Sequence, residues 1–380
     1  KLYSLFIDVP GVVPGPEDVD SFDIPDPGCT HGTYRPWAVK VHRGVVYLGV
    51  VCDASHSGGS SSDLSAYVYA FHPSTATFEE VLRFPLDYPA FTNKFNFNPW
   101  IDVWNGDCPD GGDVFCQYPQ PVLSDIDFDG DDVMVLGIMD RYSMQGGINQ
   151  HDLDGHGIHT IISFGDILRA RYDPATSTFA LENNANDGFS ETAGKNTGFG
   201  PGGGEYYFDD HAVSLAGLPV ERESVNGAVA LCPGYRTVAT TCVDPFDQFT
   251  SGIIHLNNQS GDWDRRYVII PKDFGLLIGK GNALGDIDVY SQPPPIEIGN
   301  YVWADRNGNG MQDPSEPPMP NVVVELLQRD TVIATAFTNA MGQYLFSNGE
   351  APANPRHPLS MIYGINALKP ESDYQLRIAA

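Results

Sequence analysis

The sequence predicts an all-β chain in which an irregular β-propeller is followed by a small β-sandwich. Three observations lead to this prediction. The 40 glycines and 30 prolines among the 380 residues fall between short runs of β-branched and aromatic residues, as expected for short strands joined by turns. Hairpin-like phrases recur through most of the chain. A run of prolines then separates these phrases from a shorter C-terminal part.

The proline run at residues 292–295 predicts a linker, because consecutive prolines form a stiff extended helix and cannot join a central strand. We therefore expect a large domain at residues 1–291 and a small module at residues 296–380. The first length is known for propellers and large sandwiches, and the second is that of an Ig-like module.

Two recurring phrases favour a propeller for the large domain. One phrase has two apolar strands around a tight turn, and the other has a strand, a polar turn and a strand that opens with an aromatic residue. The copies lie at residues 39–49 and 126–137 for the first phrase and at residues 67–78, 167–179 and 253–263 for the second. An inner hairpin followed by an outer hairpin is the unit of a propeller blade. A β-sandwich with long loops is the alternative fold.

Three further segments carry expectations about packing. The apolar strand at residues 2–9 is expected to close the last blade beside residues 286–290, with donation to a neighbouring subunit as the alternative. The Gly-rich polar stretch at residues 143–159 predicts a surface loop. The aromatic stretch at residues 95–104 is expected to fill a gap between blades, with an exposed sugar-stacking platform as the alternative.

The charge of the chain excludes one class of partner. Its 49 acidic and 21 basic residues give a formal net charge of −28. Nucleic-acid affinity depends on Lys and Arg that release counterions, so we expect no nucleic-acid partner. Divalent cations would offset part of the negative field. No apolar run is long enough to cross a bilayer, so we expect no membrane span in this chain.

The cysteines predict disulfides and therefore a location outside the cytosol. Their number is even, and none lies in the CxxC spacing of a zinc site. We expect three bonds between sequence neighbours, although six cysteines permit other pairings. The expected pairs are Cys29 with Cys52, Cys108 with Cys116, and Cys232 with Cys242.

A twelve-residue segment between two predicted strands matches the calcium-loop pattern D-x-[DN]-x-[DN]-G-x5-E at every defined position. Its oxygen donors alternate along the chain, a glycine permits the sharp turn, and the last glutamate is long enough to reach back. A hard divalent cation prefers such oxygen ligands, and the absence of Cys and His argues against zinc or copper. An Asx-rich hairpin without metal is the alternative. The expected calcium ligands are Asp305, Asn307, Asn309, the carbonyl of Met311, Asp313 and Glu316.

Residues 296–346 resemble the B-repeat module of SdrD-like bacterial surface proteins, through IGNYVW, DRNGNGMQD, NVVVELL and TNAMGQYLF. The resemblance implies a prealbumin-like, Ig-type sandwich with structural calcium, used as a spacer. Asn339 stands where the family usually has Asp, and Lys369 lies far from the first strand, so no isopeptide bond is expected. Through YLGVVC at residues 47–52, DIDFD at 125–129 with LGIMDR at 136–141, and GDILR at 165–169, the large domain resembles the segment that precedes such repeats in long exported bacterial proteins. This resemblance implies a propeller-like fold and supplies no activity.

Three weaker clusters carry polar chemistry. The acidic cluster at residues 125–132 is expected to be a solvated hairpin, with a cation site as the alternative. The His-rich stretch at residues 151–159 fits no zinc spacing and predicts a polar loop. Glu205, Asp209–Asp210 and His211 include acid and base groups, but no catalytic residue is assigned.

These features predict a structural or adhesive protein on the bacterial cell surface, with a calcium-rigidified spacer module. Its expected partners are other surface proteins, extracellular glycans or copies of itself, and assembly into a fibre or sheath would make it a homo-oligomer. The alternative is a secreted hydrolase or lyase that acts on polysaccharide with its site on the propeller.

Overall fold

The computed structural model divides the chain into two compact units, Lys1–Tyr290 and Ser291–Ala380. Nearly all of its regular structure is β-strand, which confirms the all-β prediction. The described part contains one short α-helix, α1 (Arg141–Gly146), and no helix long and apolar enough to cross a membrane. The described residues are 1–6, 13–91, 95–102, 108, 115–129, 132–147, 150–151, 157–161, 163–186, 199–208, 214–215, 218–219, 225–231, 237–246, 250–272, 284–289, 295–349, 351, 359–369 and 372–379.

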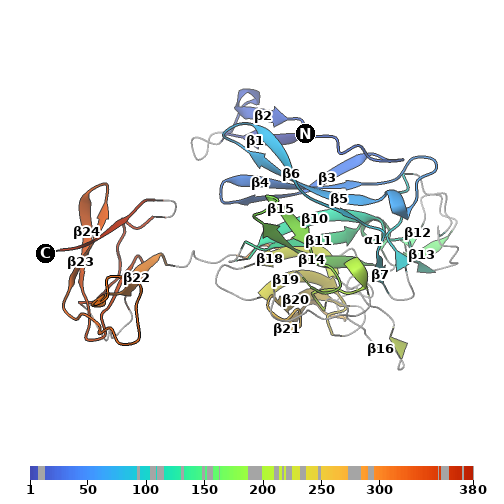
Figure 1. Cartoon of the computed structure of the whole chain (residues 1–380). Helices are drawn as coiled ribbons and strands as arrows, with labels where there is room; N and C mark the ends of the chain where they lie inside the picture. The colour runs from blue at the N-terminus through green and yellow to red at the C-terminus, as the bar shows by residue number, and fades with distance from the viewer. Residues whose placement is uncertain are drawn as a thin grey trace. The chain divides into compact units, whose positions relative to one another are not determined.

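The described part of the first unit contains three four-stranded antiparallel sheets (Figure 1). The first sheet has β3 (Tyr34–His42), β4 (Val45–Cys52), β5 (Ser65–His72) and β6 (Thr77–Pro85). The second has β10 (Pro121–Phe128), β11 (Met134–Asp140), β14 (Gly165–Asp173) and β15 (Thr178–Leu181). The third has β18 (Val225–Leu231), β19 (Thr237–Val243), β20 (Ser251–Asn257) and β21 (Trp263–Ile270).

Shorter strands form small sheets beside these three. They are β1 (Leu2–Leu5) with β2 (Val19–Phe22), β7 (Pro89–Phe91) with β8 (Phe95–Asn96), β9 (Phe115–Cys116) with β13 (Ile158–Ile161) and β12 (Gln150–His151), and β16 (Ser214–Leu215) with β17 (Leu218–Pro219). The prediction of a loop throughout residues 143–159 is therefore wrong, because this stretch contains the end of α1 and the β12–β13 hairpin.

Every hairpin phrase found in the sequence coincides with a pair of strands in the large sheets. The first phrase forms β3–β4 and β10–β11, and the second forms β5–β6, β14–β15 and β20–β21. Each sheet is thus a four-stranded unit of the blade type. Closure of such units into a propeller ring stays a prediction.

The second sheet is buried on both faces because it packs against the first and the third. Successive side chains of a strand point to opposite faces. Along β11, Leu136 and Ile138 pack in the core shared with the first sheet, whereas Val135 packs in the core shared with the third. All three side chains are fully buried. A strand of continuous apolar residues is the expected result of this arrangement.

The second and third sheets approach each other backbone to backbone. A Cβ atom placed on Gly137 would lie 2.0 Å from the carbonyl oxygen of Gly227, so only glycine fits there. Beside this contact, Asp125 Oδ2 accepts a hydrogen bond from Val229 N at 2.8 Å. Asp127 binds the third sheet in the same way. The predicted solvated hairpin is therefore wrong for these carboxylates, which bind the backbone of β18.

The expected position of the N-terminal strand is also wrong. Strand β1 pairs with β2, and residues 284–289 form no strand. Tyr3 and Leu5 are 64% and 51% exposed, so the strand is not covered on both faces. Pairing with a segment close in the chain closes a much shorter loop than pairing with residues 286–290 would, and it costs less conformational entropy.

The described residues of the second unit form a sandwich of two three-stranded sheets around its own core. One sheet has β22 (Glu297–Tyr301), β25 (Gln343–Ser347) and β26 (Met361–Ile362), and the other has β24 (Thr331–Phe337), β23 (Val323–Gln328) and β27 (Gln375–Ile378). Phe346 from the first sheet and Leu326 from the second are fully buried in the shared core. The predicted linker at residues 292–295 lies outside the described residues except for Pro295.

Candidate functional site

The predicted calcium loop, residues 305–316, connects the two sheets of the second unit. It leaves the sheet of β22 and leads into β23 of the opposite sheet. Its ends are held together by an antiparallel bridge between Trp303 and Pro318. A hydrogen bond from Ala304 N to the Pro317 carbonyl, at 3.0 Å, lies next to the bridge. The protein's own backbone contacts therefore close the loop at its base.

The first half of the loop folds around the Asp305 carboxylate. Oδ1 accepts hydrogen bonds from Gly308 N at 2.7 Å and Asn309 N at 3.2 Å, and Oδ2 accepts one from Gly310 N at 2.8 Å. Both glycines have positive φ, +68° and +75°, which a residue with a side chain rarely adopts. The Gly310 hydrogen bond and then those of Gly308 and Asn309 lower the pKa of Asp305, so this group is ionised at neutral pH.

The middle of the loop converges on Asp313. The side-chain amides of Asn307 and Asn309 donate to the same oxygen, Asp313 Oδ2, at 2.6 and 3.0 Å. Their own Oδ1 atoms accept from Asn309 N at 3.0 Å and from Met311 N at 2.7 Å. These Asx turns set alternate side chains on the inner side of the loop.

Glu316 closes the loop, as the sequence pattern requires. Its side chain is 6% exposed, and its oxygens accept hydrogen bonds from Arg306 N at 2.8 Å and from Asp313 N at 3.2 Å. The carboxylates of Asp305, Asp313 and Glu316 are not gathered within 4.8 Å of one another. An ion in this loop would therefore also need the amide oxygens and the Met311 carbonyl. This all-oxygen donor set suits Ca²⁺.

The structure places two of the three expected cysteine pairs in disulfides. Cys29 is bonded to Cys52, and Cys108 is bonded to Cys116. Cys242 is fully buried in the core of the third sheet and forms no disulfide with any described residue. Its expected partner, Cys232, lies outside the described residues.

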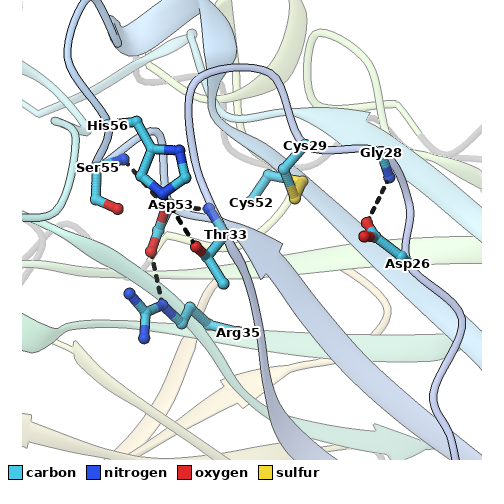
Figure 2. The surroundings of a disulfide bond; sticks show 9 residues. All are labelled: Asp26, Gly28, Cys29, Thr33, Arg35, Cys52, Asp53, Ser55 and His56. Carbon is cyan, nitrogen blue, oxygen red and sulfur yellow. Dashed lines mark hydrogen bonds and ion pairs between the residues drawn. A yellow bond between two sulfur atoms is a disulfide. The ribbon is translucent and has the colours of Figure 1, made fainter.

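A buried carboxylate lies directly after the Cys29–Cys52 disulfide (Figure 2). Asp53 accepts hydrogen bonds from Thr33 N at 2.7 Å, Ser55 N at 3.0 Å and Arg35 Nε at 2.6 Å. Burial by itself would raise the pKa of Asp53, but the hydrogen bonds from Thr33, Ser55 and Arg35 outweigh it, and the pKa is lowered. The ionised group therefore fixes the chain on both sides of the disulfide.

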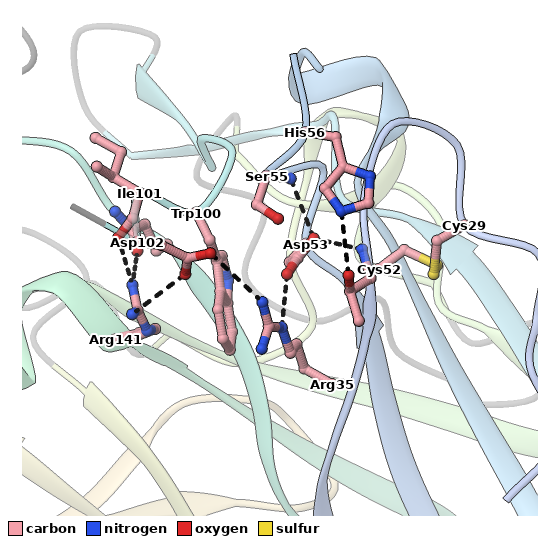
Figure 3. Close-up of polar contacts among 12 residues, drawn as sticks. Cys29, Arg35, Cys52, Asp53, Ser55, His56, Trp100, Ile101, Asp102 and Arg141 are labelled. Atoms are coloured by element: carbon pink, nitrogen blue, oxygen red, sulfur yellow. Dashed lines mark hydrogen bonds and ion pairs between the residues drawn. A yellow bond between two sulfur atoms is a disulfide. The ribbon is translucent and has the colours of Figure 1, made fainter. Parts of the chain in front are cut away.

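Two arginines occupy the faces of Trp100 (Figure 3). The guanidinium carbons of Arg35 and Arg141 lie 5.2 and 4.6 Å from the ring centroid, and the Asp102 carboxylate is 3.9 and 4.0 Å from the two groups. Trp100 is 7% exposed, and Phe97 is fully buried. In the described part of the 95–104 stretch, these two aromatic rings pack in the interior of the unit. Trp100 offers no face to a sugar.

Of the acid and base candidates predicted from the sequence, only Glu205 is among the described residues, and it is buried, as is Glu182. Glu205 and Glu182 are 0% and 1% exposed, and Glu182 accepts hydrogen bonds from Arg169 N and Tyr206 N. Burial raises the pKa of Glu182 well above its ordinary value. These groups belong to the core, out of reach of a polysaccharide. The neighbouring Asp209, Asp210 and His211 lie outside the described residues.

Buried Asp140 makes the stability of the first unit depend on pH. The side chain is 1% exposed and caps α1, and its Oδ1 accepts from Gln120 N at 2.8 Å and Tyr142 N at 2.9 Å. Burial raises its pKa to about 7. When the pKa of a carboxyl group is higher in the folded chain than in the unfolded chain, its protonated form stabilises the folded state. This contribution is fully present at pH values below the pKa of the unfolded chain. This contribution is lost as the pH rises through about 7.

We expect Asp140→Asn to flatten this pH dependence. The amide keeps the Oδ1 acceptor and removes the buried charge, so the variant should be at least as stable as the native chain at pH 8 and lose less stability between pH 5 and pH 8. Urea unfolding at both pH values measures the difference, with Asp173→Asn at the end of β14, a partly exposed position, as the control. An unchanged pH slope in Asp140→Asn would contradict the assignment.

Comparison with known proteins supports the resemblance of the C-terminal part. Residues 296–354 match the SdrD B-like domain family. Serine-aspartate repeat-containing protein D of Staphylococcus aureus (strain Newman) is 38% identical over 71 residues, which cover 18% of this chain and 5% of that protein. The predicted B-repeat module is thereby confirmed for this segment.

Longer similarities cover both units. Colossin-A of Dictyostelium discoideum is 29% identical over 363 residues, and Colossin-C of the same organism is 28% identical over 355 residues. Each match covers 88% of this chain, but the chain spans only 3% of Colossin-A and 32% of Colossin-C.

The structure also matches a GH43_1 enzyme from Xanthomonas citri complexed with xylotriose. That match has 10% identity, coverage of 63% of this chain and 56% of the other, and a TM-score of 0.29, too low to support an inference.

Proposed function

We infer, from the SdrD B-like domain at residues 296–354, that the chain belongs to an extracellular protein with a structural or adhesive role at the cell surface. The Cys29–Cys52 and Cys108–Cys116 disulfides support a location outside the reducing cytosol. Its partners would be other surface proteins, extracellular glycans or further copies of the chain. Among the acid and base candidates, the described carboxylate Glu205 is fully buried, which disfavours a polysaccharide-cleaving role for that group.

Calcium would stiffen the second unit in this proposal. The observation that carries it is the position of the 305–316 loop, which joins one sheet of the sandwich to the other. An ion held by oxygens from both halves of the loop would fix the connection between the sheets. A sandwich with a fixed connection transmits force and holds attached domains at a constant distance, which is the property of a spacer.

Protease treatment of intact producing cells tests both parts of the proposal. A protease that does not cross membranes should cleave the chain on intact cells, and calcium should slow cleavage within residues 296–380 compared with a chelator. Glu316→Gln should lose the calcium protection, whereas Glu297→Gln, the same change on exposed strand β22, should keep it.

The two parts can fail separately. Complete protection of the chain on intact cells, with cleavage after lysis, would overturn the surface location. Equal cleavage with calcium and with chelator would overturn the calcium-stiffened spacer and leave the location standing.

A further inference from the structure

A second group of metal-binding side chains lies in the first unit, far in sequence from the calcium loop. Cys108, Cys116 and His159 place one potential ligand atom each within 4.8 Å of one another. It is the one such group of His, Cys, Asp and Glu among the described residues. The sequence spacing did not reveal it, because His159 follows Cys116 by 43 residues.

Strand pairing brings the histidine to the cysteines. Strand β13 pairs in parallel with β9, and the register sets Ile161 opposite Cys116. The His159 ring then points at the sulfurs, with Nδ1 at 3.6 Å from Cys108 Sγ and 3.8 Å from Cys116 Sγ. All three residues are buried, at 5%, 0% and 8% exposure. The strand pairing therefore positions His159 and Cys116, and the disulfide joins Cys108 to them.

These distances fit a zinc site. With Zn–S near 2.3 Å and Zn–N near 2.0 Å, a tetrahedral centre separates its sulfur and nitrogen ligands by about 3.6 Å and two sulfurs by about 3.8 Å. The two sulfur–nitrogen distances already have this length. The Cα atoms of the cysteines are 5.1 Å apart, so the sulfurs can separate by side-chain rotation once their bond is broken.

The surroundings also suit a soft metal site. Tyr142 and Ile161 pack on the cysteines, and Tyr118 lies against the same cluster. Such an apolar shell limits access of water and strengthens the bonds between a cation and two thiolates. Two thiolates neutralise the charge of a divalent ion, which makes burial of the complex acceptable. The three protein ligands leave one tetrahedral position for water.

We propose that Cys108, Cys116 and His159 form a zinc site when the Cys108–Cys116 disulfide is reduced. A phosphine reductant supplies the two electrons and becomes the phosphine oxide. Its oxygen comes from water, whose two protons pass to the sulfurs. Zinc then displaces both thiol protons and binds the two thiolates and His159 Nδ1. The disulfide and the zinc site use the same sulfurs, so each state excludes the other.

Cobalt and zinc titration of the full chain tests this proposal, with saturating calcium present to occupy oxygen sites. The phosphine-reduced chain should show thiolate-to-cobalt charge transfer and tetrahedral d–d absorption, both lost on zinc addition. The untreated chain should show neither. His159→Gln should bind zinc at least about tenfold more weakly, because a direct ligand matters at least as much as the residues that orient one.

Matched variants separate this site from the other thiols. Cys29→Ser/Cys52→Ser should keep the cobalt spectrum, and Cys108→Ser/Cys116→Ser should lose it. Unchanged zinc affinity in His159→Gln, or a spectrum that persists without Cys108 and Cys116, would overturn the proposal. If circular dichroism shows that His159→Gln does not fold, the cobalt spectrum of His159→Cys tests the site instead. A three-thiolate cobalt spectrum supports the site, and the absence of any spectrum refutes it.

Discussion

Calcium at one hundred times its dissociation constant is expected to stabilise the C-terminal unit of the full chain by about 2.7 kcal/mol, because an ion that binds only the folded state shifts the unfolding equilibrium. The loop that would hold the ion is intact only in the folded unit, where its ends meet through the Trp303–Pro318 bridge. Differential scanning calorimetry with calcium and with a chelator should show the shift in the transition of this unit.

Glu316→Gln should abolish most of the calcium-induced shift. The change removes the charge of the side chain that closes the loop through hydrogen bonds from Arg306 N and Asp313 N. Glutamine keeps only one of the two acceptor oxygens, so the variant also loses one of these backbone contacts and some stability of the ion-free unit. The readout is therefore the difference between calcium and chelator in each variant. Glu297→Gln should retain the native shift. If the unfolding temperature of this unit in the native chain were the same with calcium and with chelator, the metal site would be refuted and the Asx-rich hairpin favoured.

Arg169→Met is expected to destabilise the first unit by about 3–5 kcal/mol, because removal of one partner leaves a buried charge uncompensated. Arg169 is 5% exposed, lies 3.8 Å from Asp129 Oδ2 and donates to the carbonyl of Asn258. Its guanidinium carbon is also 4.4 Å from the centroid of the Tyr206 ring. These contacts join the second and third sheets. Urea unfolding of the full chain at pH 7 measures the loss.

Two controls define this effect. Arg171→Met, on the same strand but partly exposed, should cost much less. Adding Asp129→Asn to Arg169→Met should recover part of the loss, since the second change removes the carboxylate that lost its cation. Equal losses for the two arginines, or no recovery in the double variant, would contradict the role of this ion pair.

Much of the local structure follows from the sequence because its causes are local. A hairpin needs two short apolar strands and a turn, all within about a dozen residues, and the five hairpin phrases formed strand pairs. The loop at residues 305–316 could be predicted from the sequence for the same reason, since its oxygen donors and its glycines lie in one continuous segment. The C-terminal module could likewise be identified from its motif alone.

The partners of buried charged groups could not be predicted in this way. The sequence pattern predicts a solvated hairpin around Asp125, yet this residue binds the backbone of Val229, 104 residues away. The same holds for Arg169 and Asn258, 89 residues apart. A sequence pattern shows that a strand is apolar on both faces, but the sheet that covers each face depends on packing over the whole unit.

The sequence by itself determined the all-β class, the strand hairpins and the oxygen-rich loop, because backbone periodicity and turn chemistry act over short stretches of chain. Only the tertiary structure decided that β1 pairs with β2, that Trp100 lies between two arginines, and that His159 faces Cys108 and Cys116. Those contacts form between residues far apart in the sequence, when sheets pack and strands pair. The free energy that stabilises them comes from the packing of the whole core, which no short stretch of sequence determines.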